Sequence, residues 1–197
     1  MAGHRDRSSG THCACRFRAR RQAHALCRRR FGRSVRHGLV FGVTGWKNAG
    51  KTTLVERLVA TFARRGWRVA TIKHAHHEVD IDRPGADSFR HRAAGAIETA
   101  LVGGQRYAIM REEAEPPLAA VLERLLPADL VLIEGYKREP HPKIEVCGAT
   151  ADRPPLWRGD PAIVAVAADA RPEGLALPWF ARDDIAAIAD FIAVRRG

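Results

Sequence analysis

Cysteine is scarce in most of this chain, and long apolar runs are missing. Cys147 is the one cysteine beyond residue 38; the other three are Cys13, Cys15 and Cys27. No uninterrupted apolar stretch approaches the roughly 20 residues of a membrane span, and no secretory hydrophobic region is visible. These features argue against a membrane-spanning or disulfide-bonded protein and predict a cytoplasmic one.

Acidic residues are nearly missing from residues 1–38, which contain eleven arginines and a single acid, Asp6. The formal net charge of +11 belongs almost entirely to this segment, because the other 22 basic residues face 21 acidic ones. The nearly neutral remainder argues against a nucleic-acid-binding domain. Because residues 1–38 have few apolar side chains, we expect them to be disordered and to precede a single domain over residues 39–197.

Four interpretations of the basic segment stay open. A zinc site at Cys13 and Cys15 is one, although the spacing matches no standard structural zinc pattern. An arginine-rich transit peptide and an RNA-binding arm are two others. We favour the fourth, a misplaced start of the reading frame, with translation beginning at Val35 just ahead of the first strand.

A phosphate-binding loop stands directly after the first predicted strand. Residues 45–53 read GWKNAGKTT and fit the pattern G-x-x-x-x-G-K-[ST]. An apolar strand, residues 39–43, precedes the loop, and a helix with Leu54, Leu58 and Phe62 on one face follows it. Gly66 stands where a glycine commonly ends a helix. Strand, glycine loop and helix together are the context that this motif requires.

The residue types in this loop suit a nucleoside triphosphate. Glycines at both ends let backbone amides wrap around phosphate oxygens, and the helix start adds partial positive charge. Lys51 can reach the β- and γ-phosphates, and the Thr52 hydroxyl can ligate Mg²⁺. The predicted nucleotide-binding residues of the loop are Gly45, Trp46, Lys47, Asn48, Ala49, Gly50, Lys51, Thr52 and Thr53.

Strands and helices alternate along residues 39–197, which predicts an α/β domain with a mainly parallel central sheet. Further strands are expected at 68–72, 97–102, 106–110, 130–133 and 162–168, and a Gly-Gly turn joins the second and third of these. Helices are expected at 118–126 and from Asp183 onward, and a short helix follows Asp87 as its N-cap. A Pro- and Gly-rich loop is expected over residues 150–161.

A second acidic group should complete the nucleotide site. Glu134 ends the buried strand 130–133, where ligands gather in open α/β sheets, so we expect it to bind Mg²⁺ and to take part in catalysis with Lys51. Asp129 lies at the opposite end of this strand and is expected to be a turn or cap residue. Lys137 either neutralises phosphate charge or is an ordinary solvated lysine. Asp169 follows the strand 162–168 and is a candidate to read guanine, although Asn and Lys are lacking three and two residues before it.

Residues 73–87 are rich in histidine and acid and should emerge near the phosphates. His74, His76, His77, Asp80 and Asp82 could hold a transition metal. No helix face enforces that geometry, so we favour a loop that senses γ-phosphate and Mg²⁺.

Taken together, four blocks resemble the molybdopterin-guanine dinucleotide biosynthesis protein B family. They are FGVTGWKNAGKTT (41–53), KHAHH (73–77), DIDRPGADS (80–88) and EGYK (134–137) with HPKIEV (141–146). The resemblance spans residues 39 to about 195. It implies a P-loop NTPase fold, a three-layer α/β sandwich, and a slowly hydrolysing GTP-binding protein that uses Mg²⁺.

The resemblance also implies partners and leaves alternatives. A homodimer is expected to assist the guanylyltransferase that joins GMP to molybdopterin, with molybdopterin itself and other molybdenum cofactor proteins as further partners, and with no membrane or nucleic acid involved. One alternative is a nucleotide-dependent adaptor that does not hydrolyse GTP. Others are a nickel-type metallochaperone GTPase, suggested by the histidines, and a small-molecule kinase, for which residues 39–197 show no arginine-rich lid.

Overall fold

The computed structural model describes residues 37–75, 81–148 and 153–196, and it divides the chain into two compact units. The first unit combines Met1–His74 with Leu125–Gly197, and the second covers Ala75–Arg124. The interpretations of the basic segment concern residues 1–36 almost entirely, and these lie outside the described residues.

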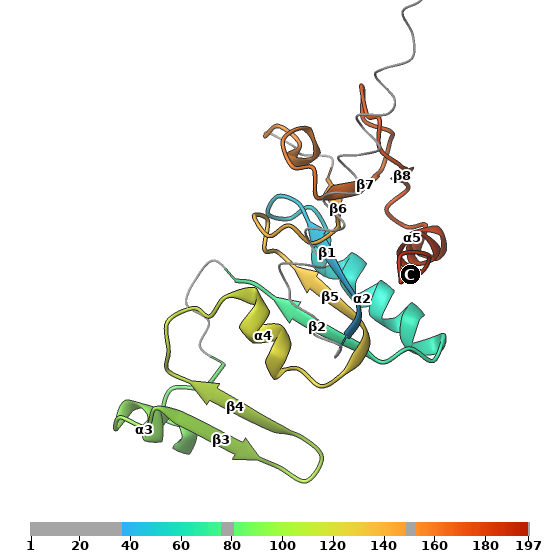
Figure 1. Cartoon of the computed structure of the whole chain (residues 1–197). Coiled ribbons are helices and arrows are strands. Elements are labelled where there is room, and N and C mark those ends of the chain that lie inside the picture. The colour runs from blue at the N-terminus through green and yellow to red at the C-terminus, as the bar shows by residue number, and fades with distance from the viewer. Residues whose placement is uncertain (1–36, 76–80, 149–152, 197) are drawn as a thin grey trace, which may run out of the picture. The chain divides into compact units, whose positions relative to one another are not determined.

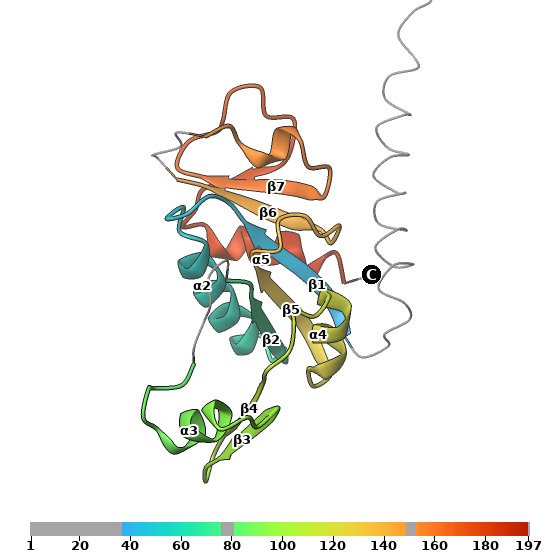
Figure 2. The ribbon, with the colours of Figure 1, turned by 90° about the vertical axis from the view of Figure 1, so that its left-hand side faces the viewer.

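Six parallel strands form the sheet of the first unit, in the order β2-β5-β1-β6-β7-β8 (Figures 1 and 2). This order confirms the predicted α/β class with a mainly parallel central sheet. β5 pairs with β1 along most of its length, from His37↔Ala128 to Val43↔Glu134. The strands are β1 (His37–Thr44), β2 (Val69–Lys73), β5 (Ala128–Glu134), β6 (Lys143–Cys147), β7 (Ile163–Ala168) and β8 (Trp179–Phe180).

Two helices, α2 (Lys51–Arg64) and α5 (Ile185–Ala193), lie on the same face of this sheet (Figure 1). Their apolar residues recur every three or four positions, as in the predicted helices, and meet the alternate inward side chains of the strands. Burying one side chain of this size contributes about 1.5–3 kcal/mol to folding. The fully buried members of this core include Phe41, Leu58, Phe62, Ile188 and Ile192.

The end of α2 shows why Gly66 is a glycine. Gly66 has a φ of 79° and donates its amide to Ala63 O at 2.9 Å, while Trp67 N donates to Phe62 O at 3.0 Å. These two bonds form a Schellman motif, and the Phe62 and Trp67 rings meet with centroids 4.8 Å apart. The predicted C-terminal glycine is confirmed, and the chain turns here toward β2.

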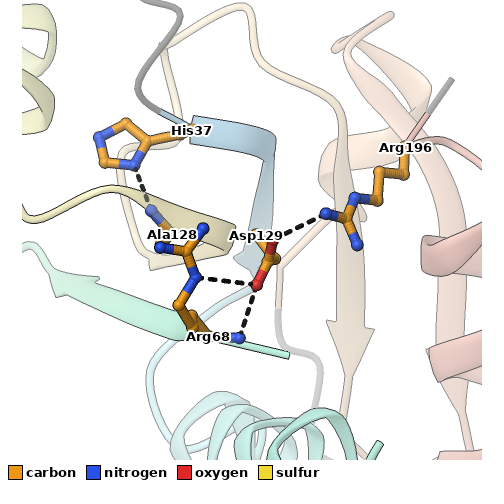
Figure 3. A network of polar contacts seen from close by, with 5 residues as sticks. All are labelled: His37, Arg68, Ala128, Asp129 and Arg196. Carbon is orange, nitrogen blue, oxygen red and sulfur yellow. Dashed lines mark hydrogen bonds and ion pairs between the residues drawn. The ribbon is translucent and has the colours of Figure 1, made fainter. Parts of the chain in front are cut away.

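A polar network joins the amino ends of β1, β2 and β5 (Figure 3). The Asp129 carboxylate accepts hydrogen bonds from Arg68 N at 2.9 Å and from Arg68 Nε at 3.2 Å. It also accepts one from Arg196 Nη2 at 2.7 Å, which ties the chain after α5 to the sheet. These donors lower the pKa of the Asp129 carboxyl, the Arg68 backbone amide contributing most. Asp129 is thus a structural residue at the edge opposite Glu134, as predicted.

The second unit contains a two-stranded antiparallel hairpin and two short helices. The turn between its strands contains the predicted Gly103 and Gly104 but is shifted by one residue: Gly103 N donates to Arg106 O at 2.9 Å, so Gly104 and Gln105 are its central residues. The expected N-cap is wrong by one position: Ala86, which makes no side-chain cap bond, is the N-cap of the first helix, and Asp87 is its first helical residue. The elements are α3 (Asp87–Ala93), β3 (Glu98–Val102), β4 (Tyr107–Arg111) and α4 (Leu118–Arg124).

Three elements differ from the predicted pattern. The interior strand β6 is not among the expected strands, because its buried Lys143 and Glu145 interrupt the apolar run. The 3-10 helix η1 (Leu156–Arg158) lies within the segment 150–161 that composition predicts as loop. β8 has only two residues, too few for any periodicity to reveal. Within the described residues, no helix combines the length and apolarity required to cross a bilayer.

Candidate functional site

The phosphate loop connects β1 to α2 at the carboxyl edge of the sheet. Gly45 has a φ of 142° and Gly50 a φ of 94°, both in the region that favours glycine. A Cβ at Gly45 would lie 2.4 Å from Val146 O of β6, so no side chain fits there. Asn48 also adopts a positive φ of 63°. The backbone therefore has the tight, left-handed turns that a phosphate cradle requires.

The side chains of the loop have distinct surroundings. Lys47 and Asn48 are exposed, Ala49 is buried, and Thr53 is exposed in the first turn of α2. Lys51 Nζ donates to Trp46 O at 2.7 Å, across the mouth of the loop. Burial lowers the pKa of Lys51; Glu134 opposes this shift, and the nearby Lys137 and Lys73 add to it. A desolvated ammonium among other cations would be stabilised by an anion such as phosphate.

Glu134 meets the phosphate loop directly. It ends β5, the neighbour of β1, and its Oε1 accepts a hydrogen bond from the Thr52 hydroxyl at 2.8 Å. Lys73 Nζ lies 3.6 Å from the same oxygen. A hydroxyl and a carboxylate side by side are the hard oxygen donors that suit Mg²⁺, so the residues present fit this ion. The structure thus brings Thr52 and Glu134 together as expected, and their roles in metal binding stay predictions.

The Trp46 ring contacts two cations. Lys137 Nζ is 4.4 Å from the centroid of the Trp46 ring, and Arg153 Cζ is 4.9 Å from it. The indole nitrogen donates to Pro154 O at 3.0 Å. Lys137 is therefore held against the phosphate loop by a cation–π contact, which disfavours the interpretation of a freely solvated lysine.

The turn after β5 is strained and braced by β2. Gly135 has a φ of 98° and Tyr136 a φ of 44°. The His74 ring stacks on Tyr136 with centroids 4.3 Å apart, and His74 N donates to Glu134 O at 2.9 Å. The start of the histidine segment thus lies beside Glu134, as predicted.

Within the described residues, the structure does not bring the other members of the expected histidine–acid set together. His76, His77 and Asp80 lie outside the described residues. The Asp82 carboxylate accepts hydrogen bonds from Ser88 Oγ at 2.7 Å and from Arg92 Nε at 3.2 Å, so it stabilises α3 in the second unit. Among residues 37–75, 81–148 and 153–196, no three histidines, cysteines or acids form a metal-binding group.

Buried Glu145 and half-buried Cys147 lie close together on β6. Glu145 accepts amide hydrogen bonds from Leu156 at 2.9 Å and Trp157 at 2.7 Å, and so anchors η1. Burial raises the pKa of Glu145, and burial together with Glu145 raises the pKa of Cys147 to about 12. A thiol with that pKa is protonated at neutral pH, which makes Cys147 a poor nucleophile.

A buried lysine supports the turn that follows Glu134. Lys143 is fully buried, and its ammonium donates to Lys137 O at 2.8 Å and to Glu139 O at 2.6 Å. Its third partner is Asp160 Oδ2 at 3.2 Å. Burial lowers the Lys143 pKa, while Asp160 opposes the shift. The sequence shows Lys143 only as part of HPKIEV, and sequence reasoning gave it no role in the site.

His141 fills the space beside Gly42 of β1. A Cβ at Gly42 would lie 2.5 Å from His141 Nε2, so the pair requires glycine. His141 is fully buried, and neither ring nitrogen has a hydrogen-bond partner among the described residues. Burial, with Lys143 nearby, lowers its pKa from 6.5 to about 3.

We expect His141 to make stability pH-dependent. Between pH 6.5 and about 3 the unfolded chain binds a proton that the folded chain excludes. Stability should therefore fall as pH falls in this window, by about 1.4 kcal/mol per pH unit where the difference is complete. Urea unfolding between pH 7.5 and 4.5 measures this slope, which His141→Leu should reduce. The exposed His91 provides the control His91→Leu; equal slopes in both variants would contradict the assignment.

Asp169 follows β7 at the same edge of the sheet, two strands from β1. Its carboxylate pairs with Arg182, through bonds of 2.6 Å from both Nε and Nη2. The structure does not place Asp169 against the phosphate loop itself. Arg182, which sequence reasoning missed, connects the two, because its Nη1 reaches Ala49 O at 3.4 Å.

Comparison with known proteins agrees with this geometry. Residues 40–169 match the model of the family described as "Molybdopterin guanine dinucleotide synthesis protein B". The "molybdopterin-guanine dinucleotide biosynthesis adapter protein" of Escherichia coli K12 is 37% identical over 153 residues, which cover 75% of this chain and 87% of that protein. The Haemophilus influenzae protein of the same name is 44% identical over 109 residues, 53% of this chain and 61% of its own length.

Solved structures show the same fold. The MobB homolog from Bacillus stearothermophilus has a TM-score of 0.60 at 32% identity, covering 80% of this chain and 97% of its own. Bacillus subtilis MobB has a TM-score of 0.65 at 26% identity, with 80% and 97% coverage. These are P-loop NTPase folds, which confirms the predicted fold class. Because the family model matches most of the chain and the fold is shared, the chain belongs to the molybdopterin guanine dinucleotide synthesis protein B family.

Proposed function

We propose that this chain binds Mg-GTP, hydrolyses it slowly, and assists the guanylyltransferase that attaches GMP to molybdopterin. The observation that carries the proposal is the hydrogen bond between Thr52 and Glu134, which joins the two halves of a nucleotide site. Lys51, Lys73 and Lys137 surround that bond with positive charge suited to a triphosphate. We infer the pathway from the family, because the relatives of this chain are named for molybdopterin-guanine dinucleotide biosynthesis.

Slow turnover follows from how Glu134 is engaged. Its Oε1 already accepts the Thr52 hydroxyl and faces Lys73, an arrangement that suits metal binding better than activation of water. Intrinsic hydrolysis without an arginine finger proceeds on the order of 10⁻⁴ s⁻¹ in small GTPases. A protein of that kind acts as a switch or a nucleotide carrier. A second candidate, an adaptor without turnover, is favoured by the word "adapter" in the names of the relatives.

The proposed partners are the guanylyltransferase, molybdopterin, other molybdenum cofactor proteins and a second copy of this chain, in the cytoplasm. A homodimer is supported by the β3–β4 hairpin, whose register places Ala100, Val102, Tyr107 and Ile109 on one face. Three of these are large and exposed, Val102 by 76%, Tyr107 by 68% and Ile109 by 58%. Two strands alone are marginally stable, and a second copy would bury this face.

Reconstitution of a guanylated molybdoenzyme tests the function. Apoprotein, molybdopterin, molybdate, guanylyltransferase and GTP are mixed with and without this protein, and the active enzyme formed is measured. We expect the protein to raise the yield, and we expect Glu134→Gln to bind GTP without raising it, because the amide carries no charge for Mg²⁺. Glu56→Gln, on the exposed side of α2, is the matched control.

The same mixtures separate the two candidate functions. Phosphate release measured with and without the guanylyltransferase distinguishes a slow GTPase from an adaptor that never hydrolyses GTP. If the unmodified protein changes neither the rate nor the yield of guanylation, the assisting role is wrong.

A further inference from the structure

The edge of the sheet beyond the phosphate loop brings together an acid and an arginine from neighbouring strands. β7 and β8 are parallel, with Ala167 opposite Phe180. Asp169 lies two residues after Ala167, and Arg182 lies two residues after Phe180. Both residues therefore lie just beyond the carboxyl edge of the sheet. This is the edge at which ligands bind in open α/β sheets, and it is the edge that carries the loop after β1.

Arg182 contacts both the acid and the phosphate loop. Its Nε and Nη2 donate to the two carboxylate oxygens of Asp169, each at 2.6 Å, in the paired geometry that a guanidinium favours. The remaining nitrogen, Nη1, lies 3.4 Å from Ala49 O and 3.5 Å from the position of a Cβ at Gly50. One planar group thus fixes the orientation of the carboxylate relative to the backbone of the loop.

The fold itself gains little from this ion pair. Asp169 is 54% exposed and Arg182 36% exposed in their side chains. Exposed pairs contribute little to stability, because water screens them and ordering the side chains opposes the attraction. Removing Arg182 should therefore leave the protein folded, which makes a role in the site separable from a role in stability.

The carboxylate retains the capacity to bind a second group. An ionised carboxylate offers about four acceptor positions, and Arg182 uses two of them. The two remaining positions, one on each oxygen, point away from each other, so each takes a single donor, and the exocyclic N2–H of guanine fits one of them. The bases of ITP and ATP lack that amino group, so GTP, ITP and ATP together report how well the acid is placed.

Within the part of the chain that the structure describes, β7 itself gives the acid no polar side chain as support. Val166 and Ala167, which stand where Asn and Lys commonly precede a guanine-reading acid, are fully buried and apolar. We propose that Arg182 replaces that support: it is a positioning residue that holds Asp169 toward the guanine base and ties it to the phosphate loop. The inference rests on the GTP binding of the proposed function and extends it to base recognition.

The test measures base preference in arginine variants. Affinities for GTP, ITP and ATP are determined by competition against a fluorescent GTP analogue, and tripolyphosphate reports on the phosphate loop alone. The unmodified protein should prefer GTP over ITP by about tenfold or more, the value of one charge-assisted hydrogen bond. Arg182→Gln should bring this ratio close to one. The tripolyphosphate affinity of the same variant separates lost base recognition from any change in the phosphate loop, which Arg182 Nη1 also contacts.

Two further variants sharpen the result. Arg182→Lys keeps the charge but cannot form the paired bonds, so it should recover only part of the preference. Arg171→Gln is the matched control, because Arg171 lies in the same loop after β7 and donates to Leu175 O at 3.1 Å instead. Its base preference should equal that of the unmodified protein, and thermal melts should show all variants folded.

Three outcomes would overturn the proposal, and a fourth bears only on the proposed function. An unchanged GTP-to-ITP ratio in Arg182→Gln would show that Arg182 does not position Asp169. A higher GTP affinity in that variant would show that Arg182 obstructs the acid. Equal affinities of the unmodified protein for all three nucleotides would defeat both this inference and the GTP assignment. A GTP preference that depends on Arg182, without stimulation of guanylation, would leave the inference standing and defeat only the assisting role.

Discussion

Replacing Lys51 by alanine is expected to weaken GTP binding by at least about 100-fold, because two charge-assisted hydrogen bonds to phosphate are lost at about 1.5–3 kcal/mol each. The Lys51 ammonium stands at the mouth of the loop, where Trp46 O is its acceptor at 2.7 Å. Phosphate oxygens would replace that carbonyl as stronger, charged acceptors. Titration of a fluorescent GTP analogue measures the change.

A control must remove a cation without touching the loop. Arg57→Ala serves, since Arg57 lies exposed on α2, one turn beyond the phosphate loop. Its affinity for GTP should stay within about twofold, because exposed charges at a distance are screened by salt. Near-normal GTP affinity in Lys51→Ala would show that residues 45–53 do not form a phosphate site.

The phosphate loop and its flanks could be predicted because their signals are local. Strand, loop and helix follow one another within 28 residues, from His37 to Arg64. Glu134 could also be predicted, since a buried apolar run marks β5 and the end of a parallel strand faces the ligand edge. The fold class followed from the same alternation of strands and helices.

The rest of the site depends on contacts that periodicity does not reveal. Arg182 reaches Asp169 because β8 lies beside β7, and a strand of two residues leaves no pattern in the sequence. A lysine is expected at the surface, yet Lys143 is fully buried, because the carbonyl oxygens of residues 137 and 139 accept hydrogen bonds from its ammonium. The N-cap position of Asp87 was wrong because the backbone of Ala86, with a φ of −65° and a ψ of 156°, already ends the preceding turn.

Replacing Lys143 by methionine should destabilise the protein by about 3–5 kcal/mol, the usual cost of breaking a buried ion pair from one side. The ammonium has three donors, and the structure supplies three acceptors: Lys137 O, Glu139 O and the Asp160 carboxylate. Methionine fills a similar volume but leaves these acceptors without their donor. Urea unfolding at neutral pH measures the loss, and Arg64→Met on the exposed end of α2 is the control for the residue introduced.

The same substitution should also affect the nucleotide site, because Lys143 holds the turn that carries Lys137. Amides 135–139 should exchange hydrogen faster in Lys143→Met, and GTP affinity should fall as Lys137 leaves the Trp46 ring. Lys143→Arg should not rescue stability, since a guanidinium is too large for a fully buried site shaped around an ammonium. A loss below about 1 kcal/mol in Lys143→Met, the range of exposed ion pairs, would contradict the buried contact on which the turn after β5 depends.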